Sequence, residues 1–176
     1  RCLGETAEIV ALTDHRRHGG RFDPWRDGLA AHPDPEQACA AARNEACERA
    51  AVAEWWLGRQ PAAPVSETWI AQAGLASRLE AMRRGAALRR RTDWWQIHSA
   101  CEPCVMVCRS VSTEGQDPIL GFGCDDDPVI AAEKALRELL LMELNLMELL
   151  AARATGAQAG LAEVCDRIRG YALHAP

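Results

Sequence analysis

Residues 28–49 read GLAAHPDPEQACAAARNEACER, and they contain the signals of a glycine turn followed by a long helix. Asp34 can accept hydrogen bonds at the N-cap, and Pro35 suits the first helical position because no backbone N–H is needed there. Gln37 completes a capping-box arrangement. We therefore predict a helix from about Pro35 to Leu57.

Residues 121–142 read GFGCDDDPVIAAEKALRELLLM and share this layout. Because Asp-Pro caps are common, two ordinary helix starts remain an alternative, but small residues and a carboxylate at matching offsets favour a duplicated glycine-turn-helix unit. We predict the last helix from Pro128 to about Ala154, and expect the amino-terminal helix with Glu5 to be a third copy. The gapless alignment places Gly28, Asp34, Pro35, Ala38, Ala42 and Glu45 onto Gly121, Asp127, Pro128, Ala131, Ala135 and Glu138.

Between these units lie short β-branched or aromatic runs that predict strands. A proline-containing linker from Gly58 to Ser66 and one helix from Glu67 to Arg84 precede them. We expect a mixed α/β (α+β) fold, in which repeated glycine-turn-helix units pack on a β-sheet, as a single domain over residues 1–176. The predicted strands are Trp94–His98, Val105–Val111 and Ile119–Phe122.

Composition describes an ordinary folded core, with 48% apolar and 26% charged residues among 176. A formal charge of -5 argues against a nucleic-acid surface. The apolar run Leu139–Leu150 is too short to span a bilayer, and we expect it to be a central buried helix. Arginines at 83, 84, 89, 90 and 91 are expected at a solvated helix end and loop.

The eight cysteines are expected to be reduced in a bacterial-type cytoplasm, since a chain this apolar needs no disulfide framework. Four residues nevertheless have a spacing that resembles metal ligands: His98, Cys101, Cys104 and Cys108. A small zinc-stabilised interaction module is therefore an alternative. The favoured interpretation is that these cysteines pack as small apolar residues.

Two pairs of glutamates three residues apart carry the clearest chemical signal: Glu5 with Glu8, and Glu45 with Glu48. Residues three apart share a helix face, where two carboxylates repel each other until a cation such as Mg²⁺ binds both. Arg49 follows on nearly the same side and offers a planar fork for a phosphate. Most such glutamate pairs are solvated surface, which is the alternative.

Successive segments of the chain resemble the motifs of the YcaO family in order and spacing. The resemblance covers nearly the whole chain, and only the combination is specific. The segments are Arg1–Glu8, Asp27–Ala31, Glu45–Arg49 continuing through Trp55-Trp56, and Gly121–Gly123 followed by Asp127-Pro128 and Ala135–Glu138.

The resemblance implies an enzyme that uses ATP and Mg²⁺ to phosphorylate a peptide backbone amide oxygen. A Cys, Ser or Thr side chain of the peptide then attacks the activated amide and yields an azoline ring, a cyclodehydration used in ribosomally made peptide natural products. The resemblance assigns Glu5, Glu8, Glu45 and Glu48 to the Mg²⁺ and phosphate site. Asp27, Arg49 and Glu138 are the further nucleotide-site residues that it implies, with Asp27 standing where many members have asparagine.

The same resemblance implies a precursor peptide as substrate, a leader-peptide-binding or E1-like companion protein and a cytoplasmic location, and it leaves a homodimer open. It implies neither a nucleic acid nor a membrane as partner. Ile9 replaces an arginine that is frequent in the family, and Leu141 and Met142 leave Glu138 without a second polar partner. We expect a partial copy of the domain. An inactive partner that binds peptide or a companion enzyme, and an accessory factor for ribosomal protein methylthiolation, are the alternatives within the family.

Overall fold

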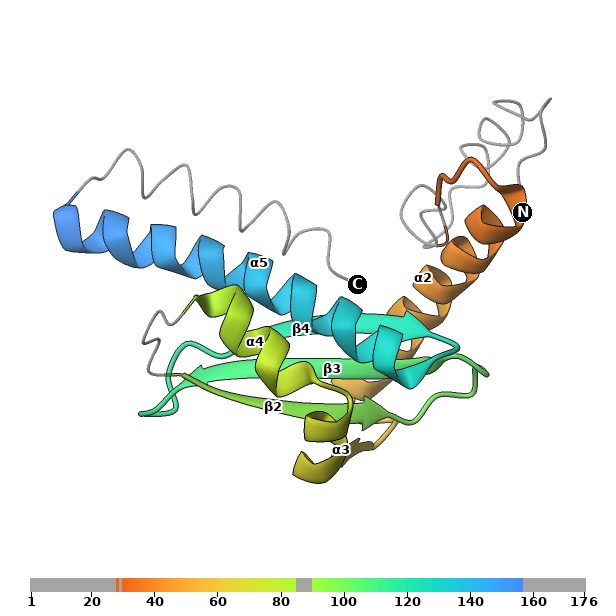
Figure 1. The fold of residues 1–176 in the computed structure, drawn as a ribbon, viewed down its shortest axis with the longest axis horizontal. Coiled ribbons are helices and arrows are strands. Elements are labelled where there is room, and N and C mark those ends of the chain that lie inside the picture. Colours follow the sequence, from red (N-terminus) through yellow and green to blue (C-terminus); the bar gives the residue numbers. More distant parts are fainter. Residues whose placement is uncertain (1–27, 29, 85–89, 157–176) are drawn as a thin grey trace.

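The computed structural model describes residue 28, residues 30–84 and residues 90–156. The expectations for Glu5, Glu8, Asp27 and the amino-terminal helix lie outside these residues. In chain order the described elements are α2 (Pro35–Trp56), β1 (Ala62–Pro64), α3 (Glu67–Gln72), α4 (Leu75–Arg83), β2 (Arg90–Ile97), β3 (Cys104–Ser112), β4 (Ile119–Asp125) and α5 (Pro128–Thr155), as Figure 1 shows.

The strands form an antiparallel sheet in the order β1-β2-β3-β4, so each strand pairs with the next along the chain. In the register, Trp94 of β2 lies opposite Cys108 of β3, and Cys108 lies opposite Gly121 of β4. β4 is an edge strand of the described sheet. The predicted mixed α/β fold is confirmed, although the strands begin or end up to four residues beyond the predicted limits.

Helices cover both faces of the sheet. On one face, α3, α4 and α5 enclose a core that includes Trp94, Cys108 and Leu136. On the opposite face, α2 packs through Trp55 against residues that include Val107. Adjacent strand residues point to opposite faces, which is why the sheet can bury apolar side chains on both sides.

Glycines let helix α5 lie directly on strand β4. A Cβ atom on Gly121 would come 2.2 Å from the Ala135 carbonyl oxygen, so no side chain fits there. At the aligned position of the first unit, a Cβ on Gly28 would come 3.2 Å from the Ala42 carbonyl oxygen. In both described units the glycine thus lies near the backbone of the helix that follows it, as the predicted repeat requires, although the approach is closer at Gly121.

The two long helices also begin alike. Asp34 Oδ1 accepts a hydrogen bond from Glu36 N at 2.9 Å, and Asp127 Oδ1 accepts one from Val129 N at 2.8 Å. These side chains satisfy N–H groups that have no partner within the first helical turn. The N-cap predictions at both helices are therefore confirmed.

The predicted single helix from Glu67 to Arg84 is wrong, because it is divided into α3 and α4. Gly74 separates them with a φ of 71°, a left-handed backbone conformation that glycine adopts without strain. The predicted linker from Gly58 to Ser66 also contains the short strand β1. Pro64 is tolerated in this strand because β1 lies at the edge of the described sheet.

The prediction of a buried helix from Leu139 to Leu150 holds only for its beginning. Leu139 is fully buried, whereas Leu141 and Leu144 are 52% and 54% exposed. A helix of 28 residues is about 42 Å long, and a strand of seven residues is about 23 Å long, so α5 extends past β4. Figure 1 shows this projecting half. Among the described helices, none has the length and hydropathy to cross a membrane.

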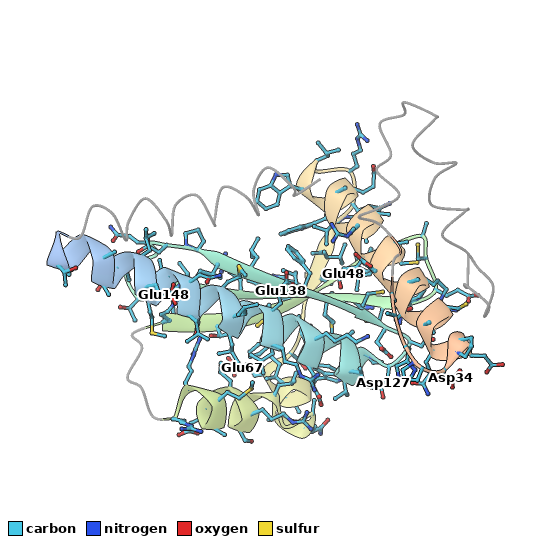
Figure 2. All side chains as sticks on the ribbon, turned by 90° about the horizontal axis from the view of Figure 1, so that it is seen from above. Asp34, Glu48, Glu67, Asp127, Glu138 and Glu148 are labelled. Atoms are coloured by element: carbon cyan, nitrogen blue, oxygen red, sulfur yellow. The ribbon has the colours of Figure 1, made fainter. Side chains whose placement is uncertain are left out.

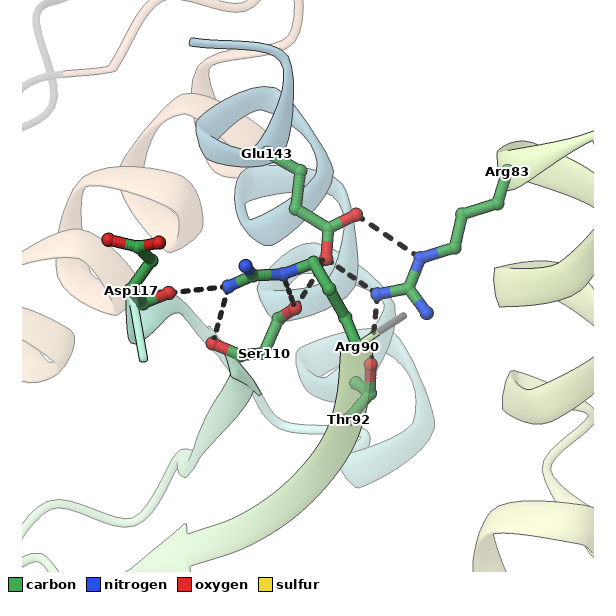
Figure 3. Close-up of polar contacts among 6 residues, drawn as sticks. All are labelled: Arg83, Arg90, Thr92, Ser110, Asp117 and Glu143. Carbon is green, nitrogen blue, oxygen red and sulfur yellow. Dashed lines mark hydrogen bonds and ion pairs between the residues drawn. The ribbon is translucent and has the colours of Figure 1, made fainter. Parts of the chain in front are cut away.

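The prediction that the clustered arginines are solvated is wrong for Arg83 and Arg90, whose side chains are only 12% and 9% exposed. Both surround the carboxylate of Glu143, which is 3% exposed (Figure 3). Arg83 Nε donates to Glu143 Oε2 at 3.1 Å, and Ser110 Oγ donates to Oε1 at 2.5 Å. The attraction of this buried carboxylate for both arginines explains why they are not free in solvent.

Candidate nucleotide and metal site

One side of α2 presents the predicted acidic pair. Arg49 Nε donates a hydrogen bond to Glu45 Oε1 at 3.1 Å, as expected for a pair four residues apart. Both side chains are about one third exposed, so solvent reaches them. Glu48 lies one turn beyond Asn44 on the same helix face. The helix therefore places Glu45, Glu48 and Arg49 together, as the sequence predicted.

Glu138 reaches the same region from α5. Its Oε2 accepts a hydrogen bond from the backbone N of Phe122 at 2.5 Å. Because β4 is an edge strand of the described sheet, an outward N–H there has no neighbouring strand to pair with, and the carboxylate satisfies it. Figure 2 shows Glu48 and Glu138 on the sides of α2 and α5 that face each other.

The electrostatics of Glu48 show that these carboxylates interact. The pKa of Glu48 is raised to about 7, chiefly by burial and also by the negative charges of Glu138 and Glu45, while the positive charges of Arg49 and Lys134 lower it. A raised carboxyl pKa means that the surroundings of Glu48 destabilise its ionised form relative to its protonated form. A bound dication would remove that penalty.

Burial also raises the pKa of Glu138, against the hydrogen bond from Phe122 and the charge of Arg49. The Glu138 residue is exposed by surface area, yet protein atoms crowd its carboxylate. Carboxylates with raised pKa values occur often at functional sites, and they occur in structural networks as well. The charge of Glu138 thus acts on Glu48, and a shared role of the two carboxylates stays a prediction.

Two further residues at this site were not predicted from the sequence. Asn44 Oδ1 is buried without a hydrogen-bond partner, one turn before Glu48. Lys134 Nζ donates to Asp125 Oδ2 at 2.7 Å and to the Cys124 carbonyl oxygen at 3.0 Å. Burial alone would raise the pKa of Asp125, but the bonds from Lys134 and from backbone N–H groups lower it. The position of Lys134, one turn before Glu138, could have suggested it as a site residue. No sequence pattern marked Asn44 as one.

The chemistry of this donor set fits Mg²⁺ bound together with phosphate. Three carboxylates and an amide oxygen are hard oxygen ligands, and one arginine offsets part of their charge. Within the described ranges, no three His, Cys, Asp or Glu side chains are close enough to hold a metal by themselves. Mg²⁺ is usually held by one or two carboxylates plus substrate phosphates rather than by a complete protein cage.

The zinc alternative is not supported by the positions of its four residues. Cys104 and Cys108 pack on the sheet face covered by α5, whereas Cys101 contacts Cys47 of α2. Burial and the hydrogen bond with Cys101 raise the pKa of Cys47 to about 11. His98 is exposed and joins no metal-binding group in the described part of the chain. The sheet separates residues that are close in sequence.

The prediction of reduced cysteines is correct for most of those described and wrong for Cys39, which is disulfide-bonded. Burial raises the pKa of the Cys124 thiol to about 12, so this side chain behaves as a small apolar residue. The free thiols are Cys47, Cys101, Cys104, Cys108 and Cys124.

Two long helices, α2 and α5, packed on opposite faces of an antiparallel sheet define the class of fold, and solved structures have the same fold. One, described as the structure of the heterocyclase TruD, is 24% identical with a TM-score of 0.58 over 73% of this chain. Another, described as a heterocyclase in complex with substrate and cofactor, is 25% identical with a TM-score of 0.56 over 68% of this chain. The matches span only 19% and 16% of those chains.

The family model described as YcaO cyclodehydratase, ATP- and Mg²⁺-binding, matches residues 7–175. This chain belongs to the YcaO family. No curated protein matches it. The predicted resemblance to the YcaO family is thereby confirmed, whereas the roles of individual residues stay predictions.

Proposed function

We propose that this chain binds ATP with Mg²⁺ at the carboxylates of α2 and α5 and uses it to phosphorylate a peptide backbone amide. The observation that carries the proposal is the meeting of Glu45, Glu48 and Glu138 at one surface, where the pKa of Glu48 is about 7. ATP and Mg²⁺ binding are part of the description of the family model. Cyclodehydration of Cys, Ser or Thr to azolines is the reaction that this activation would serve.

Each residue has a distinct task in this proposal. Glu45 and Glu48 offer oxygen ligands on one helix face, and Glu138 faces them from the other helix. Arg49 donates to Glu45 in this structure. Its planar guanidinium can bind a phosphate oxygen once cation binding has neutralised Glu45. Glu5, Glu8 and Asp27 are proposed to complete the site, and they lie outside the described residues.

The chemistry explains why positioning dominates. An amide carbonyl resists attack by a hydroxyl or thiol until its oxygen becomes a good leaving group, which phosphorylation provides. Mg²⁺ supplies charge neutralisation of the phosphates during this transfer. The protein's own contribution is to align the amide oxygen with the γ-phosphate and to arrange charges in advance. We propose a ribosomally made precursor peptide as the substrate, with a leader-binding or E1-like companion protein as partner.

An inactive, peptide-binding role is a second candidate. The aligned position of Glu48 in the second unit is Leu141, which is 52% exposed. The second unit therefore presents one carboxylate where the first presents two, and cation binding rests on fewer ligands. A domain of this kind could bind peptide or a companion enzyme without turning over ATP.

Calorimetric titration of ATP with and without Mg²⁺ into the chain tests the proposal. We expect Mg²⁺-dependent binding by the parent, a loss of at least about tenfold in affinity for a Glu45→Gln, Glu48→Gln double variant, and a smaller loss for Glu138→Gln. A Glu54→Gln variant is the matched control, because Glu54 is on the same helix and pairs with Arg59 at 3.1 Å. Absence of binding by the folded parent would reject the nucleotide site and favour the inactive role.

A labelling experiment tests the chemical step. A precursor peptide with oxygen-18 in the amide that becomes the azoline should transfer that oxygen to phosphate, which the isotope shift in phosphorus NMR detects. Label retained in the peptide or found only in water, with a ring nevertheless formed, would contradict amide phosphorylation. Mass spectrometry records the accompanying loss of water from the peptide.

A further inference from the structure

The thiols of Cys47 and Cys101 lie in contact at one end of the sheet, and neither has a role in the proposed ATP site. They share a hydrogen bond. Both are reduced in this structure, and both are partly exposed. Cys47 lies on α2, whereas Cys101 lies far along the chain, on the loop between β2 and β3. Two thiols that meet from separate elements can form a covalent tie between them.

The packing of α2 on the sheet brings these thiols together. Cys47 packs against a buried cluster that includes Ile97 and Val105. Ile97 is the last residue of β2 and Val105 is the second residue of β3, so these two residues flank the loop that carries Cys101. Their place in the same cluster puts this loop beside α2, independently of the hydrogen bond between the thiols.

Hydrogen bonds hold the loop in place. His98 N donates to the Pro61 carbonyl oxygen at 3.0 Å, and Cys101 N donates to Ser99 Oγ at 2.9 Å. Pro103, on the other side of Cys101, is buried. Because the backbone on both sides of Cys101 is fixed, rotation of side-chain torsions is the main change that brings the two sulfur atoms to the disulfide bond length of about 2 Å.

Small oxidants can reach this pair of thiols. Cys47 and Cys101 each keep some exposed surface, and the neighbouring salt bridge joins Arg43 and Asp126, whose side chains are 50% and 67% exposed. Cys124 also lies near Cys47, but it is only 2% exposed. Access therefore favours Cys101 over Cys124 as the partner of Cys47.

We propose that Cys47 and Cys101 form a reversible disulfide that fastens α2 to the β2–β3 loop, with a low-molecular-weight disulfide such as oxidised glutathione as the oxidant. One cysteine thiolate attacks a sulfur of the oxidant, and one glutathione thiolate leaves. The second cysteine thiolate attacks the mixed disulfide and releases the other glutathione. The two cysteines lose two protons and two electrons, and the S–S bond of the oxidant is reduced to two thiols.

The cross-link restrains the turn of α2 that carries Glu45 and Glu48, because Cys47 lies between them in the sequence. It also closes a long loop of chain, which reduces the conformational freedom of the unfolded state. We therefore expect the thermal midpoint of unfolding to rise by several degrees on oxidation. This expectation does not depend on nucleotide binding.

Peptide mapping of the chain after treatment with oxidised glutathione tests the proposal. Because the pKa of the Cys47 thiol is raised to about 11, exchange is slow at neutral pH, and the reaction is run at about pH 8.5. The remaining thiols are alkylated before digestion with trypsin and a protease that cleaves after glutamate. Cleavage after Glu102 separates Cys101 from Cys104, which trypsin alone leaves in one peptide.

We expect mass spectrometry under non-reducing conditions to find Cys47 joined to Cys101. Excess reduced glutathione should release the two peptides from each other. A folded chain in which Cys47 stays reduced, or in which it is joined to Cys124, would overturn the proposal.

Two serine variants provide a matched comparison, with circular dichroism to confirm that each is folded. Cys101→Ser should lose both the cross-link and the rise in thermal midpoint. Cys104→Ser should keep both, because Cys104 packs on the other face of the sheet. An equal rise in midpoint for oxidised Cys101→Ser, or loss of the cross-link in Cys104→Ser, would contradict the assignment.

Discussion

Replacing Glu48 with glutamine should stabilise the ligand-free protein at about pH 8. The pKa of Glu48 is about 7 in the folded chain, compared with an ordinary value of 4.5. A raised carboxyl pKa means that the folded state binds the proton more tightly than the unfolded state does. Ionisation therefore penalises the fold fully above pH 7, and the penalty declines as the pH falls toward 4.5.

The magnitude follows from the same shift. A change from 4.5 to about 7 corresponds to at most about 3 kcal/mol, and solvent screening of a partly exposed carboxylate reduces this to about 1–2 kcal/mol. Glutamine keeps the shape of the side chain but cannot ionise. The variant should therefore gain about 1–2 kcal/mol in free energy of unfolding at high pH, and progressively less as the pH falls.

Urea unfolding of the parent and of Glu48→Gln at several pH values between about 5 and 8 measures this gain. Glu54→Gln is the control, because Glu54 is on the same helix but its side chain is 43% exposed, and the change should be a loss of less than about 1 kcal/mol. The reasoning is refuted if Glu48→Gln lowers stability at pH 8, or if it raises stability equally at every pH.

Other perturbations test the fold and its thiols. Gly121→Ala should lower the free energy of unfolding by more than about 3 kcal/mol or prevent folding, because its Cβ would meet the backbone of α5. Gly115→Ala should lower it by about 1 kcal/mol, since only the positive φ of Gly115 is affected. Chemical unfolding measures both losses, and similar losses would contradict this packing. Glu143→Ala should cost about 3–5 kcal/mol in the same assay because it leaves Arg83 and Arg90 buried without their carboxylate, and a loss below 1 kcal/mol would show that this network is not formed. Cys124, whose pKa is about 12, should resist iodoacetamide at neutral pH in the folded chain and react after unfolding, as mass spectrometry would record; rapid alkylation of the folded chain would contradict its burial.

Local signals predicted much of the fold. Asp34 and Asp127 are followed by proline, so both helix starts could be read from capping chemistry. The break at Gly74 could not, because a single glycine inside a periodic apolar pattern is often tolerated and only tertiary packing decides whether the chain turns. The burial of Arg83 and Arg90 was missed for a similar reason: their carboxylate partner, Glu143, is more than fifty residues away in sequence.

The candidate site was predicted in part. Helical spacing alone places Glu45 beside Glu48, and the repeat alignment of Glu45 with Glu138 identified the α5 residue that shares this surface. The alignment did not reveal that Glu138 would bind the edge of β4 through Phe122, since that contact depends on strand order. Asn44 could not be predicted from the sequence, because an isolated asparagine within a helix has no distinctive pattern. Only the structure shows that its Oδ1 is buried without a hydrogen-bond partner.

The most direct measurement is affinity cleavage with Fe²⁺ replacing Mg²⁺ in its complex with ATP. Radicals formed at the bound iron cut the nearby backbone, and mass spectrometry locates the cuts. We expect cuts in α2 near Glu45 and Glu48 and in α5 near Glu138, and excess Mg²⁺ with ATP should suppress them. Cuts confined to other segments, with nucleotide binding intact, would contradict the assignment of these carboxylates to the ATP site.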